Sequence, residues 1–377
     1  MQEKNAPARL LVDTRIFGGR VTGVGRYLSN LLREIHLLEP SDLKLHALCS
    51  PGQDLPCKIP KIEMHGVGAH SKPLGLMQQF VLPRAVRNAQ CDLFHYPYFD
   101  PPRITSCPFI ATCYDIEPLR HPELFPRRIV WYYKALAPRL RAAERVVVIS
   151  QNTGKDLIEL LGVHPDRVKV VYLGVDPHFH PIREEDRVDA VRLRYGLPSR
   201  YLLYLGNTMP HKNLVRLVQA MAIVHKRFPS VPLLLAGRKD KYRPAVEQAI
   251  VVANLSETIR FIGDIAEEDL PALLSSAAVF VYPSLYEGFG LPVLEAMACG
   301  APVVTSNRSS LPEIVGNAAI SVDPYDVSAL AEAITHLLAN PAGARRYSVL
   351  GPERAKEFTW RRCAEEHLAV YREVLNR

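Results

Sequence analysis

The feature that most constrains the fold is a repeated alternation of short apolar runs with amphipathic stretches. In the first half of the chain, the apolar runs are 9–13, 44–48, 93–95, 109–113 and 145–149. The pattern restarts in the second half, with runs at 201–205, 232–236, 259–262, 278–282 and 301–305. Apolar runs separated by helical segments such as 213–227 are typical of parallel sheets covered by helices. The sequence therefore predicts an α/β protein with two doubly wound, Rossmann-like domains.

The length of the chain also fits two domains. Its 377 residues exceed what one hydrophobic core usually organises, and a hydrophobic content of 48% can supply two cores. Residues 172–186 are rich in proline, histidine and charge without a clear apolar period, which places the boundary near 174–187. We assign 1–178 to an N-terminal domain and 179–358 to a C-terminal domain. Ligands of open α/β sheets bind beyond the carboxyl ends of the strands, so we expect the ligand in a central cleft between the domains.

Hydropathy and cysteine usage favour a cytoplasmic protein. The chain has no run of eighteen apolar residues, and its start, MQEKNAPARLLVD, lacks the regions of a secretory signal. The cysteines are scattered, without a C-x-x-C pair, which favours reduced thiols over disulfides or a zinc site.

The positive charge is concentrated in the N-terminal half. Residues 1–176 hold 23 Lys and Arg against 17 Asp and Glu, a net +6, and the rest holds 23 against 22, a net +1. The halves add to the formal charge of +7. This excess suits an anionic partner such as nucleic acid or a membrane leaflet, but a solvated surface of mixed charge explains it equally well.

The stretch 286–295, YEGFGLPVLE, predicts a ligand-binding turn. It follows a buried strand, and Pro292 suits the first turn of a helix that ends at Gly300. Gly288 and Gly290 would let the backbone approach a ligand, and the free N–H groups at the helix start attract phosphate. Glu295 could then accept hydroxyls of a ribose. The alternative is that this carboxylate only complements the helix dipole and that the turn is solvated.

The residues around this turn resemble a known family. The spacing E-x7-E between Glu287 and Glu295, and the sequence that follows it, are similar to the donor-site signature of family 4 glycosyltransferases. The other blocks that match are TGVGRY at 22–27, VISQNTGKDLI at 148–158, GVDPHF at 174–179, YLGNTMPHKNL at 204–214 and FTWRRCAEEHLAVYREVL at 358–375. The resemblance implies a retaining enzyme of the two-domain GT-B fold, in which the C-terminal helix, 359–377, returns to the first domain.

The resemblance also implies roles for these residues. Glu287 would contact the transferred sugar and Glu295 the nucleotide ribose. The turn residues Gly288, Phe289, Gly290 and Leu291 would contact the donor. Gly23 and Gly25, which we expect in a loop between a strand and a helix, would approach the donor diphosphate. A loop of this kind could instead be a dinucleotide-binding fingerprint. A dehydrogenase would need an acidic residue at the end of the next strand, and the sequence has none there.

The departing diphosphate needs fixed positive charge or a metal ion. Lys212 is the best candidate, because an exposed lysine at a helix start would be unfavourable there. Many relatives have a second cationic residue where this chain has Asn207. Arg238 could supply the second cation, but it could equally be a solvated arginine that binds no ligand. No D-x-D triplet ends a strand of the second domain, so we expect no metal or other cofactor.

In the first domain, the family places a histidine before an aspartate near the transferred sugar. Tyr114 stands there, before Asp115, and a phenol is a poor base near neutral pH. His95 and His121 lie nearby in sequence, and each is better explained as structural. Retention without a protein nucleophile is explained in this family by front-face attack, in which the donor phosphate accepts the proton. Glu287 would orient the sugar rather than act as the nucleophile.

The donor and the acceptor are inferred only from the general similarity of the second domain to other enzymes. The second domain is most similar to mannosyltransferases of polysaccharide or lipid-linked glycan assembly, which favours GDP-mannose as the donor and a glycan or a lipid-linked acceptor as the partner, without nucleic acid. The alternatives are a UDP-sugar transferase, a sugar-nucleotide epimerase or dehydrogenase, and a silent binding protein. The stretch 125–150 predicts a basic, aromatic helix joined to a strand. The helix could rest on anionic membrane at the inner face of the plasma membrane or pack on the core with a solvated basic side.

Overall fold

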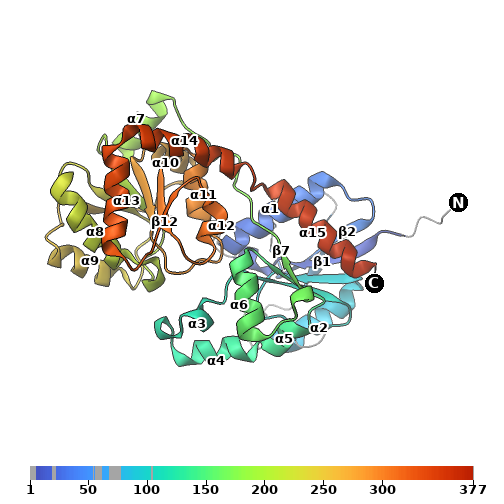
Figure 1. Ribbon diagram of the computed structural model, residues 1–377. Helices are drawn as coiled ribbons and strands as arrows, with labels where there is room; N and C mark the ends of the chain where they lie inside the picture. The colour runs from blue at the N-terminus through green and yellow to red at the C-terminus, as the bar shows by residue number, and fades with distance from the viewer. Residues whose placement is uncertain are drawn as a thin grey trace. The chain divides into compact units, whose positions relative to one another are not determined.

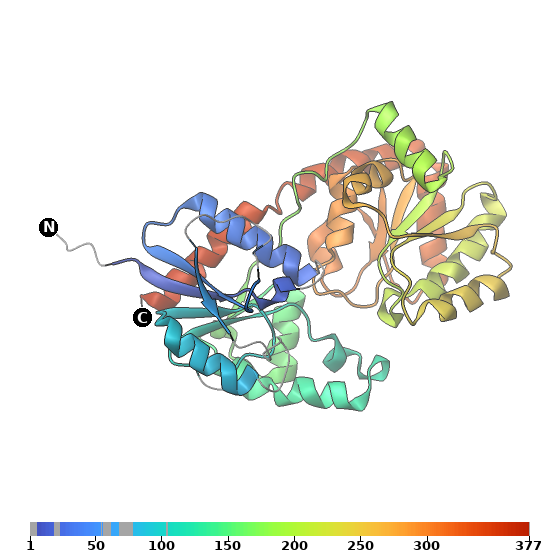
Figure 2. The ribbon, with the colours of Figure 1, turned by 180° about the vertical axis from the view of Figure 1, so that it is seen from behind.

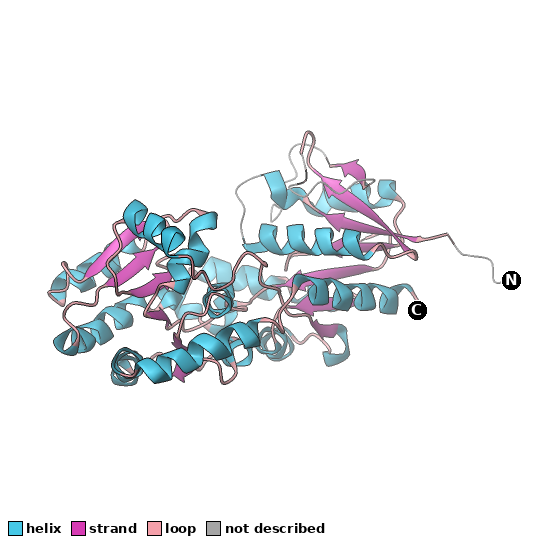
Figure 3. Cartoon of the chain, turned by 90° about the horizontal axis from the view of Figure 1, so that it is seen from above, coloured by secondary structure: helices cyan, strands magenta, loops and turns pink. Residues whose placement is uncertain are grey.

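The computed structural model describes residues 6–18, 23–53, 55, 62–67, 78–102 and 105–376 (Figure 1). The chain forms two compact units, of which the first comprises 1–174 and 359–377 and the second 175–358. Each unit contains one parallel sheet with helices on both sides of it (Figure 3). This architecture is the predicted pair of doubly wound α/β folds.

The first unit is built on a seven-stranded sheet with the order β3-β2-β1-β4-β5-β6-β7. Its strands are β1 (Ala8–Asp13), β2 (Leu43–Cys49), β3 (Glu63–Gly66), β4 (Leu93–Tyr96), β5 (Phe109–Cys113), β6 (Arg145–Val148) and β7 (Val168–Val170). Its helices are α1 (Gly23–Leu38), α2 (Gln78–Ala89), α3 (Glu117–Arg120), α4 (Arg127–Ala135), α5 (Ala137–Ala142), α6 (Gln151–Leu161) and α15 (Trp360–Leu375), with 3₁₀ turns η1 (Arg15–Gly18), η2 (Pro122–Leu124) and η3 (Pro165–Arg167). The central strands β4, β5 and β6 are buried along their whole length, which explains why their sequences are mostly apolar.

The second unit has a six-stranded sheet with the order β10-β9-β8-β11-β12-β13. Its strands are β8 (Leu202–Leu205), β9 (Leu233–Ala236), β10 (Ile259–Gly263), β11 (Val279–Tyr282), β12 (Val303–Ser306) and β13 (Ile320–Val322). Its helices are α7 (Glu185–Tyr195), α8 (Leu214–Arg227), α9 (Arg243–Val252), α10 (Leu270–Ser275), α11 (Leu291–Ala298), α12 (Leu311–Val315), α13 (Val327–Ala339) and α14 (Pro341–Ala355), with 3₁₀ turns η4 (Pro210–Lys212) and η5 (Glu267–Asp269).

The C-terminal helix α15 lies beside α1 in the first unit (Figure 2). Thr359 begins it as an N-cap by accepting a hydrogen bond from the backbone N–H of Arg362 at 3.1 Å. Close packing continues at Gly174, where an added Cβ would lie 2.2 Å from the backbone nitrogen of Trp360. The return point of the chain therefore requires glycine at that position.

A buried chain of hydrogen bonds joins α15 to the sheet. Tyr371 Oη lies 2.8 Å from His95 Nδ1, and His95 Nε2 lies 2.8 Å from Thr112 Oγ1. Tyr27 Oη lies 2.7 Å from His367 Nε2, whose Nδ1 lies 2.8 Å from the carbonyl oxygen of Cys363. A carbonyl only accepts, so Nδ1 of His367 carries the proton and Tyr27 donates to Nε2. The neutral histidines thus fix α15 to the core.

Two local predictions differ from the structure. Gly23 and Gly25 lie in the first turn of α1, not in the loop before it. The segment 125–145 holds two helices, α4 and α5, which meet at Leu136. Pro138 explains this break, because its ring has no N–H to continue the first helix and suits the start of a second. No helix in the described part of the chain has the length and apolar character needed to span a membrane.

Candidate functional site

The switch point of the second sheet lies between β8 and β11. These two strands are neighbours, and the strand order runs in opposite directions on either side of them. The loop 206–213 leaves the carboxyl end of β8, and the loop 283–290 leaves that of β11. In open α/β sheets the crevice for a ligand opens at this position.

Lys212 and Glu287 form an ion pair across this switch point. Lys212 Nζ donates to Glu287 Oε1 at 2.6 Å and to the Tyr282 hydroxyl at 3.0 Å. The side chains of the pair are only 10% and 11% exposed, respectively. Ser284 Oγ donates to the same carboxylate oxygen at 2.5 Å. Lys212 is therefore a buried, oriented ammonium group rather than a solvated surface lysine.

The charge of Glu287 is maintained despite its burial. Burial pushes the pKa of this carboxyl up, but the charges of Lys212 and His211 and the hydrogen bonds from Lys212 and Ser284 push it down. The result is a pKa below the ordinary value for glutamate. The carboxylate is thus ionised at neutral pH and can stabilise positive charge or accept hydroxyl groups.

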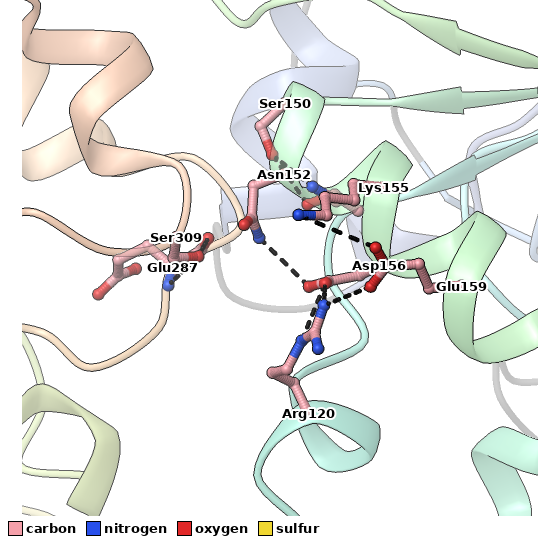
Figure 4. A network of polar contacts seen from close by, with 9 residues as sticks. Arg120, Ser150, Asn152, Lys155, Asp156, Glu159, Glu287 and Ser309 are labelled. Carbon is pink, nitrogen blue, oxygen red and sulfur yellow. Dashed lines mark hydrogen bonds and ion pairs between the residues drawn. The ribbon is translucent and has the colours of Figure 1, made fainter.

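The turn that carries Glu287 is held by two serines. The backbone N–H of Glu287 donates to Ser309 Oγ at 3.1 Å, and Ser309 Oγ donates to the Glu287 carbonyl at 2.6 Å (Figure 4). Ser310 Oγ lies 3.0 Å from the same carbonyl and 2.8 Å from that of Phe289. The serines precede α12 and fix the backbone, so the carboxylate is positioned by its turn and by its partners.

The helix α11 starts directly after this turn. Gly290 has a φ of +107°, and an added Cβ would lie 2.7 Å from Leu311 Cδ2, so this residue must be glycine. Leu291 is the first residue of the helix, and Gly288 and Phe289 belong to the preceding turn. Glu295 lies one turn inside α11 and is 5% exposed. The predicted strand, glycine turn and helix are confirmed.

The other side of the site is fixed by Asn213. This residue has a φ of +62°, which ends the turn η4 and begins α8. Its Nδ2 donates to the carbonyl oxygens of Pro283 at 3.1 Å and Pro324 at 2.7 Å. Because Asn213 follows Lys212 directly, these bonds tie the lysine loop to the glutamate loop.

The residues considered for a second cation lie near the ends of β8 and β9. Asn207 is exposed, and its Oδ1 accepts the backbone N–H of Met209 at 3.2 Å. Arg238 Nε pairs with Asp264 at 2.6 Å, and both side chains are 59% exposed. Gly206 and Gly237 pack against each other, because a Cβ at Gly237 would lie 2.0 Å from the carbonyl oxygen of Gly206. Arg238 is therefore a solvated arginine with a carboxylate partner, unlike Lys212.

Two predicted site residues of the first unit, His95 and Tyr114, are engaged in internal hydrogen bonds. His95 is fully buried, with one ring nitrogen bonded to Thr112 and the other to Tyr371. The hydroxyl of Tyr114 donates to the Pro97 carbonyl at 3.0 Å, and burial raises the pKa of this phenol well above 10. These contacts suit structural roles and exclude Tyr114 as a base at neutral pH.

Asp115 and Gly23 are less enclosed than Gly25. Asp115 is half-buried, and its Oδ1 accepts the backbone N–H of Glu117 at 3.3 Å. Gly23 is exposed at the start of α1, where a Cβ would meet nothing within 4 Å, and Gly25 is buried. Asp115 and Gly23 are therefore accessible from solvent.

Sequence reasoning missed an ionic network in the first unit (Figure 4). Arg120 of α3 binds Asp156 of α6 through two nitrogens, and it also contacts Glu159 at 3.1 Å. Asn152 donates to the second oxygen of Asp156 at 3.2 Å. The partners are far apart in sequence, so no local pattern indicated them. The network fixes α3, which follows Asp115.

The comparisons with known proteins agree with this architecture. Residues 21–179 match the family model described as Glycosyltransferase Family 4, and residues 192–354 match that described as Glycosyl transferases group 1. A similar protein is O-antigen chain mannosyltransferase B of Escherichia coli, which is 31% identical over 93% of this chain and 96% of its own length. The chain belongs to the family 4 glycosyltransferases.

Solved structures confirm the GT-B fold of this glycosyltransferase. Sucrose-phosphate synthase from Thermosynechococcus elongatus has a TM-score of 0.78 at 23% identity, covering 98% of this chain and 99% of that one. HepE of Anabaena, solved in complex with UDP and glucose, has a TM-score of 0.77 at 20% identity, covering 97% of this chain and all of its own. Membership of the family implies a nucleotide-sugar donor and a glycan acceptor.

Proposed function

We propose that this glycosyltransferase is a retaining, metal-independent hexosyltransferase that moves mannose from GDP-mannose to a glycan or lipid-linked acceptor. The observation that carries the proposal is the Lys212–Glu287 ion pair at the carboxyl ends of β8 and β11. The pair places a cation and an anion side by side, at the position where the fold binds ligands. A sugar diphosphate needs the cation at its leaving group and the anion at its sugar.

Lys212 would stabilise the departing diphosphate. Its ammonium group is 10% exposed, so a phosphate oxygen that replaces Glu287 as its partner meets it in a site with little water. Charge interactions are stronger in such surroundings than in water. The positive end of the α11 helix dipole would attract the same diphosphate, and Glu295, one turn further on, would hold the ribose.

Glu287 would orient the sugar and favour positive charge at its anomeric carbon. The low pKa of this carboxyl keeps it ionised, which suits this role rather than that of a proton donor. The proton of the attacking hydroxyl would pass to the donor phosphate on the same face of the sugar. Retention of configuration follows, because the new bond forms on the face that the diphosphate leaves.

The absence of a metal requirement is a separate part of the proposal. Lys212 and the helix start supply positive charge where other glycosyltransferases need a divalent ion. Transfer in excess EDTA at an undiminished rate would support this part, and loss of transfer that Mg²⁺ or Mn²⁺ restores would contradict it.

Mannose is favoured over glucose by the sequence relatives. O-antigen chain mannosyltransferase B aligns along nearly its whole length, whereas the structure with UDP and glucose is only 20% identical and supports the fold alone. A UDP-sugar is the second candidate donor. Thermal-shift measurements with GDP-mannose, UDP-glucose and ADP-glucose distinguish these donors, and a shift with UDP-glucose alone would exclude GDP-mannose.

The acceptor side of the proposal includes contact with an anionic membrane. Helix α4 has no buried residue, Trp131 is 71% exposed, and Arg127, Arg128 and Lys134 are exposed beside it. Aromatic and basic side chains on one helix suit the interface of anionic lipid. The chain should sediment with anionic liposomes at low salt and be released by high salt. Absence of binding at low salt would refute the proposed membrane contact.

The activity test uses the purified full chain with radiolabelled GDP-mannose in EDTA. Slow donor hydrolysis needs no acceptor, so release of GDP and mannose is the first readout, with Lys212→Ala as the inactive comparison. Lys226→Ala, which removes an exposed lysine of α8, is the matched control. Equal release by all three proteins would show that the site has been misplaced.

A further inference from the structure

Two histidines and a glutamate meet on the outer strands of the first sheet. His46 lies on β2, and Glu63 and His65 lie on β3, which is the edge strand. In the parallel register His46 is paired with Glu63, and Leu48 is paired with His65. Side chains two residues apart point to the same face of a strand, so all three residues share one face. In the described ranges of the chain, no other such group of metal-binding side chains occurs.

The spacing of the three groups matches a first-row metal ion. His46 Nδ1 lies 2.9 Å from His65 Nε2, and each nitrogen lies 3.7 Å from an oxygen of Glu63. Ligands at about 2.0 Å from a tetrahedral zinc ion are about 3.3 Å from one another. The observed distances lie on both sides of this value, so shifts of a few tenths of an ångström would complete the geometry.

The chemistry of the donor set selects among metals. Two imidazoles and one carboxylate suit zinc and its neighbours, whereas calcium and magnesium prefer ligands that are all oxygen. His46 is 2% exposed, so its ring is enclosed by the sheet and the residues around it. Its Nδ1 is the nitrogen that faces the cluster.

We propose that His46, Glu63 and His65 form a zinc-binding site that fixes the edge strand β3 to β2. The site would leave a fourth position open to water, because Glu63 is exposed and His65 is half-buried. Without metal, the two histidines share one hydrogen bond at 2.9 Å, and among the described residues Nε2 of the buried His46 has no hydrogen-bond partner. Zinc would replace the shared proton and join the two strands through side chains, in addition to their backbone hydrogen bonds. The proposal concerns β2 and β3 alone, so its failure would leave the donor site in the second unit unaffected.

Lys44 gives the proposal its most specific consequence. Its Nζ contacts Glu63 Oε2 at 3.2 Å, and its side chain is 50% exposed. The ammonium group therefore competes with a metal ion for the carboxylate and adds like charge beside it. Removal of Lys44 should strengthen zinc binding, whereas removal of a structural hydrogen-bonding residue would not.

The experiment measures zinc binding by the full-length chain after removal of metal with EDTA. Titration of Zn²⁺ against a chromogenic chelator gives the affinity and stoichiometry, and Co²⁺ absorption reports tetrahedral geometry. The variants are His65→Gln and Glu63→Gln, which leave the buried His46 in place and so should fold. The control is His164→Gln, because His164 and Asp166 form an exposed pair, 3.5 Å apart, outside the cluster.

We expect one tight Zn²⁺ site per chain. The His65 and Glu63 variants should lose at least tenfold in affinity, the Lys44→Ala variant should gain severalfold, and the His164 control should match the wild type. Wild-type affinity in both the His65 and the Glu63 variants would overturn the proposal, as would an equal loss in the His164 control or weaker binding after Lys44→Ala.

Discussion

Each unit of this glycosyltransferase has a buried ion pair at the switch point of its sheet, but the two pairs differ in access. In the first unit, Arg15 and Asp13 lie at the end of β1, beside β4, and both side chains are fully buried. In the second unit, Lys212 and Glu287 lie at the ends of β8 and β11 and keep 10% and 11% exposure. The same position in two similar folds therefore holds one pair that is sealed from solvent and one pair that is slightly exposed to solvent.

The geometry of the pairs explains this difference. Arg15 is two residues from Asp13, and its Nε and Nη2 bind both carboxylate oxygens at 2.5 to 3.1 Å. Lys212 and Glu287 come from loops 75 residues apart, and one ammonium group meets one oxygen. A bidentate guanidinium pair is rigid and geometrically complete, whereas an ammonium is a point charge that can exchange partners. We infer that the first pair serves the fold and the second serves the ligand.

The largest expected effect comes from breaking the sealed pair. Asp13→Ala should cost about 3–5 kcal/mol in the free energy of unfolding, because it leaves the buried Arg15 charge without its carboxylate. Urea unfolding of the first unit measures this loss. The control is Asp42→Ala, which removes an ion pair with Arg372. The side chains of Asp42 and Arg372 are 48% and 46% exposed, so this change should lower the free energy of unfolding by less than about 1 kcal/mol. A similar small cost for both variants would erase the distinction between the pairs.

The accessible pair should affect chemistry instead. Lys212→Ala should lower turnover by roughly 10², about 2.7 kcal/mol in the activation barrier, because the leaving diphosphate loses its cation. Steady-state rates with saturating donor measure this effect, and Lys226→Ala provides the surface control. A loss below threefold would mean that Lys212 is another structural residue like Arg15.

Low pH should lower the free energy of unfolding of the first unit through its buried histidines. Burial lowers the pKa of His367 from 6.5 to about 4, so the unfolded chain binds an extra proton between these values. Stability should therefore fall as the pH drops from 6.5 toward 4, by at most about 1.4 kcal/mol per pH unit for this residue. Urea unfolding at pH 7.0, 5.5 and 4.5 measures the slope. The slope should be shallower in His367→Gln, and an unchanged slope would refute the assignment.

The smallest effect is expected at Glu295. Glu295→Ala should weaken binding of GDP by about tenfold, roughly 1.4 kcal/mol, with little change in the rate at saturating donor. Glu287→Ala should show the opposite balance, with reduced turnover and little change in GDP affinity, because its partner is the sugar. Calorimetry with GDP and steady-state kinetics separate the two. Equal, small losses of turnover and GDP affinity in the Lys212, Glu287 and Glu295 variants would show that the donor site lies elsewhere.

The sequence predicted the regular parts of both folds because most residues of their inner strands are apolar. The C-terminal helix and the turn before α11 were confirmed as well, because helical periodicity and glycine placement are local signals. The short edge strands β3, β7 and β13 were not predicted. They have three or four residues and are not fully buried, so their composition resembles that of a loop.

The site was predictable in part. The E-x7-E spacing and the lysine loop indicated the residues of the candidate site, but not that Lys212 and Glu287 pair with each other, because a contact across 75 residues has no local signature. The sealed pair was missed although DTR at 13–15 offered a signal, a carboxylate at the end of an apolar run with an arginine two residues on. The break at Leu136 also had a local sign in Pro138, which the apolar pattern around it concealed.

The most direct test of the central claim is a crystal structure of the chain with GDP-mannose or GDP. We expect the diphosphate to lie at the start of α11, with an oxygen within hydrogen-bonding distance of Lys212 Nζ, and Lys212 to have shifted from Glu287 toward it. A diphosphate bound elsewhere, with the Lys212–Glu287 pair unchanged at 2.6 Å, would contradict this expectation.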